Sequence, residues 1–121
     1  MTVATNLLPG FEPRDLRVSG VPLRYYVRGA GKPIVLVHGL GGAATNWAEV
    51  ASPLASRHRV IVVDLPGHAD SPPLPAPATM AQFGDRVGAV IDHEALGPAL
   101  LVGHSLGAVV VVRLAARRPA A

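Results

Sequence analysis

The sequence contains no cysteine and few charged or aromatic residues. Without cysteine it can form neither a disulfide framework nor a thiolate metal site. Charged residues make up only 16% of the 121 residues, and the formal net charge is +3. The basic residues are nearly all arginines, scattered singly or in pairs instead of lying along one stripe. We therefore expect no nucleic-acid partner.

Long apolar segments are also missing. The longest uncharged apolar stretch, residues 99–112, is about fourteen residues long, whereas a membrane helix needs about twenty. Residues 1–10 lack the basic cluster and apolar core of a secretory signal. Because hydrophobic residues still make up 50% of the sequence, we expect one domain with a buried core, no membrane partner and, by default, a cytoplasmic location.

Short apolar runs predict the strands. Residues 15–28 alternate apolar and polar side chains around Ser19 and Gly20, which is typical of a hairpin of two half-buried strands. Three continuous apolar runs are typical of parallel strands covered on both faces: residues 34–37, 60–63 and 99–102.

Helical patterns lie between these runs. Asn46 is expected to cap a first helix, which kinks or starts again at Pro53. Thr79 and Gln82 form a capping-box pair ahead of a second helix with one apolar face. A third helix is expected over residues 105–116. The alternation predicts an α/β fold, with an N-terminal β-hairpin leading into a mostly parallel sheet flanked by helices.

One serine lies in a pattern that supports nucleophilic catalysis. Gly103-His104-Ser105-Leu106-Gly107 fits G-x-S-x-G between a predicted buried strand and a predicted helix. Small residues two before and two after the serine allow a sharp turn that leaves Oγ exposed above the sheet. The helix N-terminus then supports negative charge at this position. We expect Ser105 to be the nucleophile and His104 to contribute to substrate binding.

A glycine-rich segment follows another predicted strand. His38-Gly39-Leu40-Gly41-Gly42 can aim backbone N–H groups at a developing oxyanion. The amides expected to take this role are those of Leu40 and Leu106. His38 is expected to hold the loop by hydrogen bonds instead of transferring protons, and to line the substrate site together with Gly39 and Gly41.

Three segments together resemble the α/β-hydrolase superfamily, in its serine-nucleophile branch. They are VLVHGLGG at residues 35–42, VIVVDLPGHADS at residues 60–71 and LLVGHSLG at residues 100–107. We expect a small ester-like or related carbonyl substrate and no cofactor. The resemblance implies strand order 1-2-4-3-5, Ser105 as nucleophile and the amides of Leu40 and Leu106 as oxyanion hole. It does not identify that substrate. Serine at position 105 resembles the esterase, lipase, C–C-bond hydrolase and cofactor-free perhydrolase branches and departs from the epoxide hydrolase and haloalkane dehalogenase branches.

Two features depart from the family pattern. Ala69 stands where relatives usually have glycine, and a positive φ there would carry strain of about 1 kcal/mol or more. The acid and the histidine of the triad should follow the serine, but the residues after Ser105 include no Asp, Glu or His. Among the earlier histidines, His68 could lie near the rim of the site.

These gaps suggest an incomplete domain. We expect residues 1–121 to be the N-terminal portion of a single α/β-hydrolase domain, truncated after the helix that follows Ser105 and inactive alone. The apolar strand at residues 99–102 would then lie uncovered at the edge of the sheet. The oligomeric state stays open.

Two other interpretations stay open. The same scaffold could be a non-catalytic module for ligand or partner binding, which the change Ser105→Ala would leave intact. A dinucleotide-binding domain is the other, because Gly39, Gly41 and Ala44 fit G-x-G-x-x-A and Asp64 follows at the end of the next strand. The histidines show no paired spacing with carboxylates, so no metal site is expected.

Overall fold

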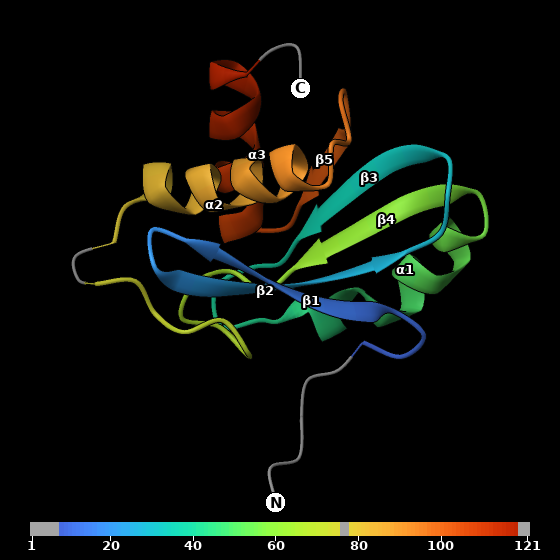
Figure 1. The fold of residues 1–121 in the computed structure, drawn as a ribbon, viewed down its shortest axis with the longest axis horizontal. Helices are drawn as coiled ribbons and strands as arrows, with labels where there is room; N and C mark the ends of the chain where they lie inside the picture. Colours follow the sequence, from blue (N-terminus) through green and yellow to red (C-terminus); the bar gives the residue numbers. More distant parts are fainter. Residues whose placement is uncertain (1–7, 76–77, 119–121) are drawn as a thin grey trace, which may run out of the picture.

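A computed structural model describes residues 8–75 and 78–118. These residues form an open five-stranded sheet with helices on both faces (Figure 1). In chain order the elements are β1 (Glu12–Val18), β2 (Val21–Arg28), β3 (Lys32–Val37), the 3₁₀ helix η1 (Ala44–Trp47), α1 (Ala48–Ala55), β4 (His58–Val63), α2 (Met80–His93), β5 (Leu100–Gly103) and α3 (Leu106–Arg117).

The strands lie in the order β1-β2-β4-β3-β5. The β1–β2 hairpin joins β4 through an antiparallel pairing, and β4, β3 and β5 pair in parallel. The predicted fold class and the strand order implied by the family resemblance are both confirmed. Because the three parallel strands end at one edge of the sheet, the loops that begin after them bring together Gly39, Asp64 and Ser105.

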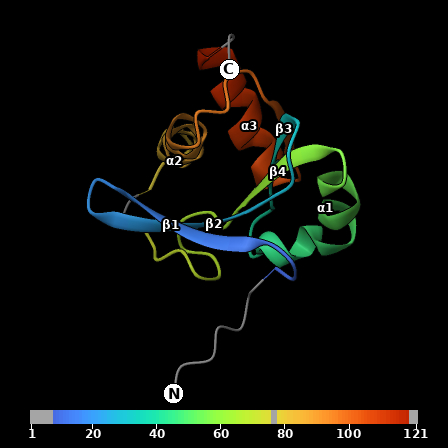
Figure 2. The ribbon, with the colours of Figure 1, turned by 45° about the vertical axis from the view of Figure 1, so that its right-hand side comes forward.

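The two faces of the sheet carry separate apolar cores. One face packs against α2 and α3, and its buried strand residues include Tyr25, Val35 and Ile61. The other face packs against η1 and α1 with Leu36 and Val62. Figure 2 shows α1 on one side of the strands and α2 with α3 on the other. No helix among residues 8–75 and 78–118 is long and apolar enough to cross a membrane.

The first helix begins later than predicted. Asn46 lies in η1, where its Oδ1 accepts a hydrogen bond from the Ala43 N–H at 2.9 Å. α1 starts only at Ala48, with Trp47 as its N-cap, so the prediction that Asn46 caps this helix was wrong. The side chain of Asn46 closes the turn before the helix instead. α1 then continues through Pro53 to its end two residues later.

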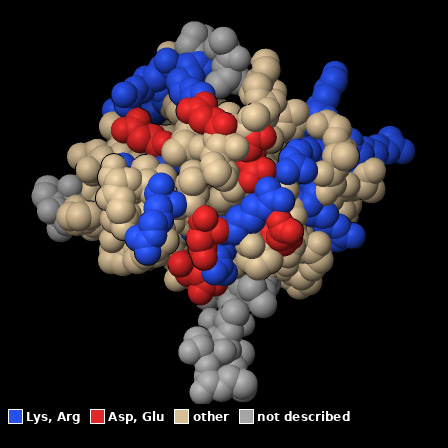
Figure 3. All heavy atoms as spheres, in the orientation of Figure 1, with Lys and Arg blue, Asp and Glu red and all other residues tan. Residues whose placement is uncertain are grey.

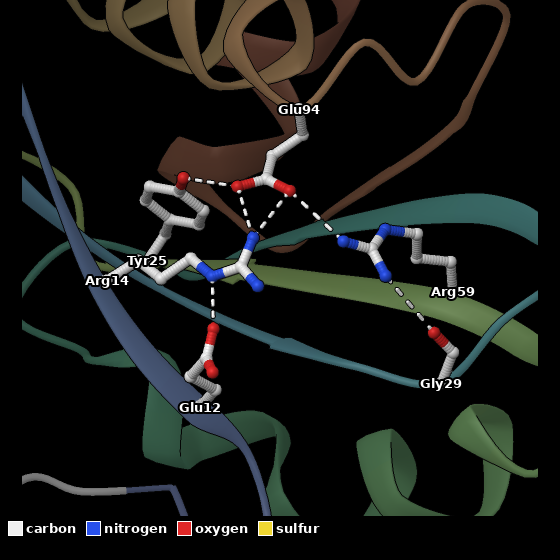
Figure 4. A network of polar contacts seen from close by, with 6 residues as sticks. All are labelled: Glu12, Arg14, Tyr25, Gly29, Arg59 and Glu94. Carbon is white, nitrogen blue, oxygen red and sulfur yellow. Dashed lines mark hydrogen bonds and ion pairs between the residues drawn. The ribbon is translucent and has the colours of Figure 1, made fainter.

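The second helix is fixed at both ends. At its start the predicted capping box forms: the Gln82 N–H donates to Thr79 Oγ1 at 3.2 Å, and the Thr79 N–H donates to Gln82 Oε1 at 2.8 Å. At its end, Glu94 accepts hydrogen bonds from Arg14 at 2.8 and 2.7 Å, from Arg59 at 3.1 Å and from the Tyr25 hydroxyl (Figure 4). This network joins the end of α2 to β1, β2 and β4.

The same network controls the charge of Glu94. Burial alone would raise the pKa of this carboxyl group, but the hydrogen bonds from Tyr25, Arg14 and Arg59 outweigh it and lower the pKa to about 2. Only 6% of the Glu94 side chain is exposed. Removing this carboxylate would therefore leave two arginines without their shared partner.

Most other ion pairs lie on the surface. Arg24 donates to Asp15 at 2.8 Å and Arg118 to Asp92 at 2.5 Å. On the face seen in Figure 3, basic and acidic side chains lie next to one another. Exposed pairs of this kind contribute at most about 1 kcal/mol each, so the two apolar cores account for most of the stability.

Among the described strands, β5 has β3 as its one neighbour. Leu100 on β5 is 61% exposed, and Val109 and Val112 on α3 are 49% and 66% exposed. Leu100 therefore lies uncovered on the edge strand, where the sequence predicted an uncovered apolar strand.

Candidate active site

Ser105 occupies the sharp turn between β5 and α3. It is the N-cap of α3, with φ +57° and ψ −117°. A non-glycine residue rarely adopts this conformation, which costs about 1–3 kcal/mol and persists only where the surroundings enforce it. Here the His104 N–H donates to the Val37 carbonyl at 3.1 Å, which ties the turn to β3. The side chain of Ser105 is exposed at the carboxyl edge of the sheet, as G-x-S-x-G predicts.

Glycine at position 103 is required by a close backbone approach. A Cβ atom placed on Gly103 would lie 2.3 Å from the carbonyl oxygen of Gly107. The first turn of α3 therefore folds back directly over the end of β5. This explains in physical terms why small residues flank the serine in the motif.

The segment after β3 forms a tight turn against Ser105. The Gly42 N–H donates to the Gly39 carbonyl at 3.0 Å, and Gly41 has φ +76°, as at the third position of a type II turn. A Cβ atom on Gly39 would lie 3.1 Å from the Cβ of Ser105, so the two turns touch. Among the described residues, neither the Leu40 nor the Leu106 amide has a hydrogen-bond acceptor. Both are available as donors at this edge.

His38 bridges this turn to the loop after β4. Its Nε2 accepts from the Leu65 N–H at 2.9 Å, and its Nδ1 lies 2.7 Å from the Gly39 carbonyl oxygen. A backbone N–H only donates and a carbonyl only accepts, so Nδ1 carries the proton and the ring is neutral. Burial lowers the pKa of His38, which favours this neutral form. His38 therefore holds the loop, and both its nitrogens are engaged.

His68 forms a second bridge between the same two loops. Its Nε2 accepts from the Gly41 N–H at 2.9 Å, and its Nδ1 lies 3.1 Å from the Pro66 carbonyl oxygen. The centroids of the His38 and His68 rings are 4.9 Å apart. In this arrangement both nitrogens of His68 are occupied, so the ring cannot accept the Ser105 proton.

Asp64 is fully buried and structural. Its Oδ1 accepts from the Ala44 N–H at 2.7 Å and its Oδ2 from the Asp70 N–H at 3.3 Å. Burial raises the pKa of this carboxyl group, and the two backbone hydrogen bonds oppose that shift. In a dinucleotide site this acid would have to face a ribose hydroxyl. Both Asp64 oxygens are buried and already accept hydrogen bonds, so neither is free to bind a ribose, which argues against a dinucleotide-binding domain.

A cavity of about 480 Å³ opens beside the serine. It is lined by residues from the turn of Ser105, the glycine-rich turn, η1 and α1: His38, Gly39, Leu40, Gly42, Asn46, Trp47, Val50, His104 and Ser105. Gly41, which the sequence placed in the substrate site, is absent from this lining. The sequence placed Asn46 only at the start of a helix and gave no sign that Trp47 and Val50 line the site, because periodicity does not tell a face that lines a cavity from one that packs in a core.

The site is incomplete in the described residues. Across residues 8–75 and 78–118, no histidine or carboxylate makes a hydrogen bond with the Ser105 hydroxyl. No group of three or more His, Asp or Glu side chains is arranged to hold a metal ion in this part of the chain. The arrangement thus provides an exposed serine, free backbone donors and a cavity, but no proton acceptor.

An exposed serine on a strand-to-helix turn of a mixed sheet is typical of α/β enzymes with a serine nucleophile, and comparison with known proteins points to the same kind of fold. A family model described as the alpha/beta hydrolase fold matches residues 32–121. The chain belongs to the alpha/beta hydrolase fold family.

Individual relatives extend this comparison. The chain is 40% identical over 103 residues to the dihydrolipoyllysine-residue acetyltransferase component of the acetoin cleaving system of Cupriavidus necator, covering 84% of this chain and 28% of that protein. It is 36% identical over 95 residues to (E)-2-((N-methylformamido)methylene)succinate hydrolase of Acinetobacter baylyi, covering 78% of this chain and 36% of that protein. The crystal structure of an epoxide hydrolase from Vigna radiata matches with a TM-score of 0.87 and 25% identity, covering 95% of this chain and 39% of that one. The chain thus spans about a third of the length of these curated relatives.

Proposed function

We propose that the protein is a serine hydrolase that forms an acyl-enzyme on Ser105 with an ester-like or related carbonyl substrate. The observation that carries the proposal is the strained conformation of Ser105, at φ +57° and ψ −117°, on a turn that exposes its side chain to a cavity. Strain of this kind is found at functional sites, where the surrounding structure maintains it.

The reaction would proceed through a tetrahedral intermediate. Ser105 Oγ gives its proton to a general base and attacks the carbonyl carbon, and the carbonyl oxygen takes the negative charge. The amides of Leu40 and Leu106 then donate to that oxyanion, helped by the positive N-terminal end of α3. The intermediate collapses, and the leaving group departs with the proton from the base. Water, deprotonated by the same base, then attacks the acyl-enzyme, which releases the carboxylic acid and restores the Ser105 hydroxyl.

The cavity favours an uncharged group at this end of the substrate. Its lining includes no Asp, Glu, Lys or Arg in the described part of the chain. Leu40, Trp47 and Val50 offer apolar contacts, and Asn46 and His104 offer polar ones. A charged acyl group would lose its hydration there without gaining an ion pair. We therefore expect a neutral acyl group in this cavity.

The names of the relatives are compatible with this chemistry. One is called an acetyltransferase component and another an (E)-2-((N-methylformamido)methylene)succinate hydrolase. An acyl-enzyme serves either outcome, because water or another nucleophile can accept the acyl group. The acyl group on Ser105 can therefore pass to water or to another nucleophile, and we propose that water is the acceptor in the whole protein.

The general base and its acid partner are proposed to lie in residues beyond α3. The relatives are about three times as long as the matched segment, and no His, Asp or Glu among the described residues makes a hydrogen bond with the Ser105 hydroxyl. In this reading the 121 residues are the N-terminal portion of one hydrolase domain. They supply the nucleophile, the oxyanion donors and one wall of the cavity.

The alternative is a non-catalytic module that uses the cavity to bind a ligand. The lack of a base beside Ser105 in the described residues is the observation that favours it. A module of this kind would bind equally well with serine or alanine at position 105. The serine hydrolase would lose its activity.

Turnover of p-nitrophenyl acetate separates the two. The complete protein should hydrolyse this ester, Ser105→Ala should reduce kcat/KM by at least about 1,000-fold, and Ser52→Ala, a change at an exposed serine of α1, should have no effect. Residues 1–121 alone should show almost no turnover. Equal rates for the complete protein and its Ser105→Ala variant would reject the proposed function.

A further inference from the structure

We infer that His68 is a positioning residue for the turn of residues 39–42, and that it acts only as a neutral imidazole. It holds the Leu40–Gly41 peptide and so keeps the shape of the turn, in which the Leu40 N–H, carried by the neighbouring Gly39–Leu40 peptide, is a free donor beside Ser105. The inference rests on the proposed function only for the role given to the Leu40 amide.

The hydrogen bond from Gly41 selects one form of the turn. Type I and type II turns differ mainly by a flip of their central peptide, which here joins Leu40 to Gly41. Gly41 has φ +76°, the type II value, and its N–H donates to His68 Nε2 at 2.9 Å. Flipping the peptide would turn this N–H away from the ring. His68 therefore stabilises the observed form over its alternative.

Little else fixes this peptide. A Cβ atom on Gly41 would meet no heavy atom within 4 Å, and Leu40 is 78% exposed. By contrast, a Cβ atom on Gly39 would lie 3.1 Å from the Cβ of Ser105, and a Cβ atom on Gly42 would lie 2.3 Å from Asn46 Oδ1. The two ends of the turn are thus held by packing, whereas its centre depends on the bond to His68.

The partners of His68 also fix its protonation. Gly41 N–H can only donate, so Nε2 must be unprotonated, and the Pro66 carbonyl opposite Nδ1 can only accept. Protonation of the ring would place an N–H against the Gly41 N–H and replace the hydrogen bond by repulsion. Acidification should therefore release the centre of the turn.

The charged groups around the ring do not supply another partner. His38, from the loop after β3, lies with its ring centroid 4.9 Å away and is itself neutral. Within the loop of His68, Asp64 accepts from two backbone amides. Asp70 Oδ2 lies 3.5 Å from Arg24 Nη1 and accepts from the Tyr26 hydroxyl at 3.4 Å. Both carboxylates thus have partners other than His68.

Nuclear magnetic resonance tests the bond without relying on activity. In the complete protein labelled with [15N]glycine and [15N]histidine, a coupling across the hydrogen bond should join the Gly41 nitrogen to His68 Nε2. The coupling should disappear as His68 is protonated, and the Gly41 amide shift should follow the His68 titration. His93, which is exposed on α2, provides the control, because its titration should not move Gly41. A missing coupling in a neutral sample would overturn the inference and leave the proposed function untouched.

Kinetics of two variants test the positioning role. His68→Leu removes the acceptor and should lower kcat about 10-fold with KM unchanged, since a misplaced oxyanion donor acts mainly in the transition state. His68→Gln offers an amide oxygen near the position of Nε2, so it should retain most of kcat. Because this oxygen is not protonated as the pH falls, the variant should also lose less kcat at acidic pH than the original protein. His93→Gln is the matched control and should behave as the original protein. Equal loss in both His68 variants, or unchanged kinetics in His68→Leu, would contradict the role.

Discussion

A Cβ atom placed on Gly107 would lie 2.2 Å from the carbonyl oxygen of Val37. The first turn of α3 therefore rests directly on the backbone at the end of β3. This contact joins the helix that follows Ser105 to the strand that precedes the glycine-rich turn. The relative position of the serine and the Leu40 amide depends on it.

The change Gly107→Ala should therefore destabilise the protein strongly. The added methyl group would collide with backbone atoms that cannot move aside, and the loss in free energy of unfolding should be about 3 kcal/mol. Urea denaturation measures it. Gly84→Ala in α2 is the matched control, because its Cβ would meet no atom closer than 4.0 Å. That variant should be stabilised by about 0.5–1 kcal/mol through helix propensity, and an equal loss in both variants would contradict the explanation.

Glu94→Gln should remove a pH-dependent part of the stability. The folded protein holds the pKa of Glu94 at about 2, below the ordinary value of 4.5, so the carboxylate stabilises the fold at pH values above 4.5. That stabilisation should fade as the pH falls from 4.5 towards 2. At pH 7 the variant should lose about 2 kcal/mol, allowing for the partial exposure of Arg14 and Arg59.

Denaturation at several pH values tests this account of Glu94. The difference between the original protein and Glu94→Gln should shrink as the pH approaches 2. Glu12→Gln is the control, because Glu12 is largely exposed where it pairs with Arg14, and it should change stability by less than about 0.5 kcal/mol. A difference that stays constant down to pH 2 would mean that the carboxylate charge is not the cause.

Ala69→Gly should stabilise the protein. Ala69 has φ +47°, a conformation that is unfavourable for a residue with a Cβ atom. Glycine removes this strain, and the gain should be about 1 kcal/mol, reduced slightly by the greater freedom of the unfolded chain. Ala43→Gly is the matched control, since Ala43 has φ −158° and carries no such strain. Thermal unfolding should show a higher midpoint for the first variant only.

Adding NAD or NADP should leave the midpoint of thermal unfolding unchanged. Both Asp64 oxygens accept hydrogen bonds from backbone amides, so neither is free for a ribose hydroxyl. A ligand that binds the folded state would stabilise it by RT ln(1 + L/Kd), where L is the free ligand concentration, and so raise the midpoint. Stabilisation by the nucleotide that is lost in Gly41→Val would instead support a dinucleotide site.

Sequence patterns predicted most of this fold because they report local geometry. The apolar runs gave the three parallel strands, and Thr79 with Gln82 gave the start of α2. The strand order needed the family resemblance, since periodicity carries no information about which strands are neighbours. Asn46 was misassigned because the same side chain can cap a helix or close a preceding turn, and the choice depends on a backbone conformation that the sequence does not specify.

The candidate site was predictable in part. G-x-S-x-G indicated the turn that carries Ser105, and the glycine-rich segment indicated the Leu40 amide. The bridging role of His68 was not predictable, because it depends on how the loop after β4 lies across the loop after β3. The same holds for Gly41, whose N–H points to His68 while its neighbours line the cavity.

The most direct test of the central claim is to trap the acyl group on Ser105. The complete protein would be mixed with p-nitrophenyl acetate, quenched with acid during turnover and digested for mass spectrometry. We predict one added acetyl group on the peptide that contains Ser105, and none at this position in the Ser105→Ala variant. Turnover with no acetyl group on this peptide, or with the acetyl group on another residue, would contradict the claim that Ser105 is the nucleophile.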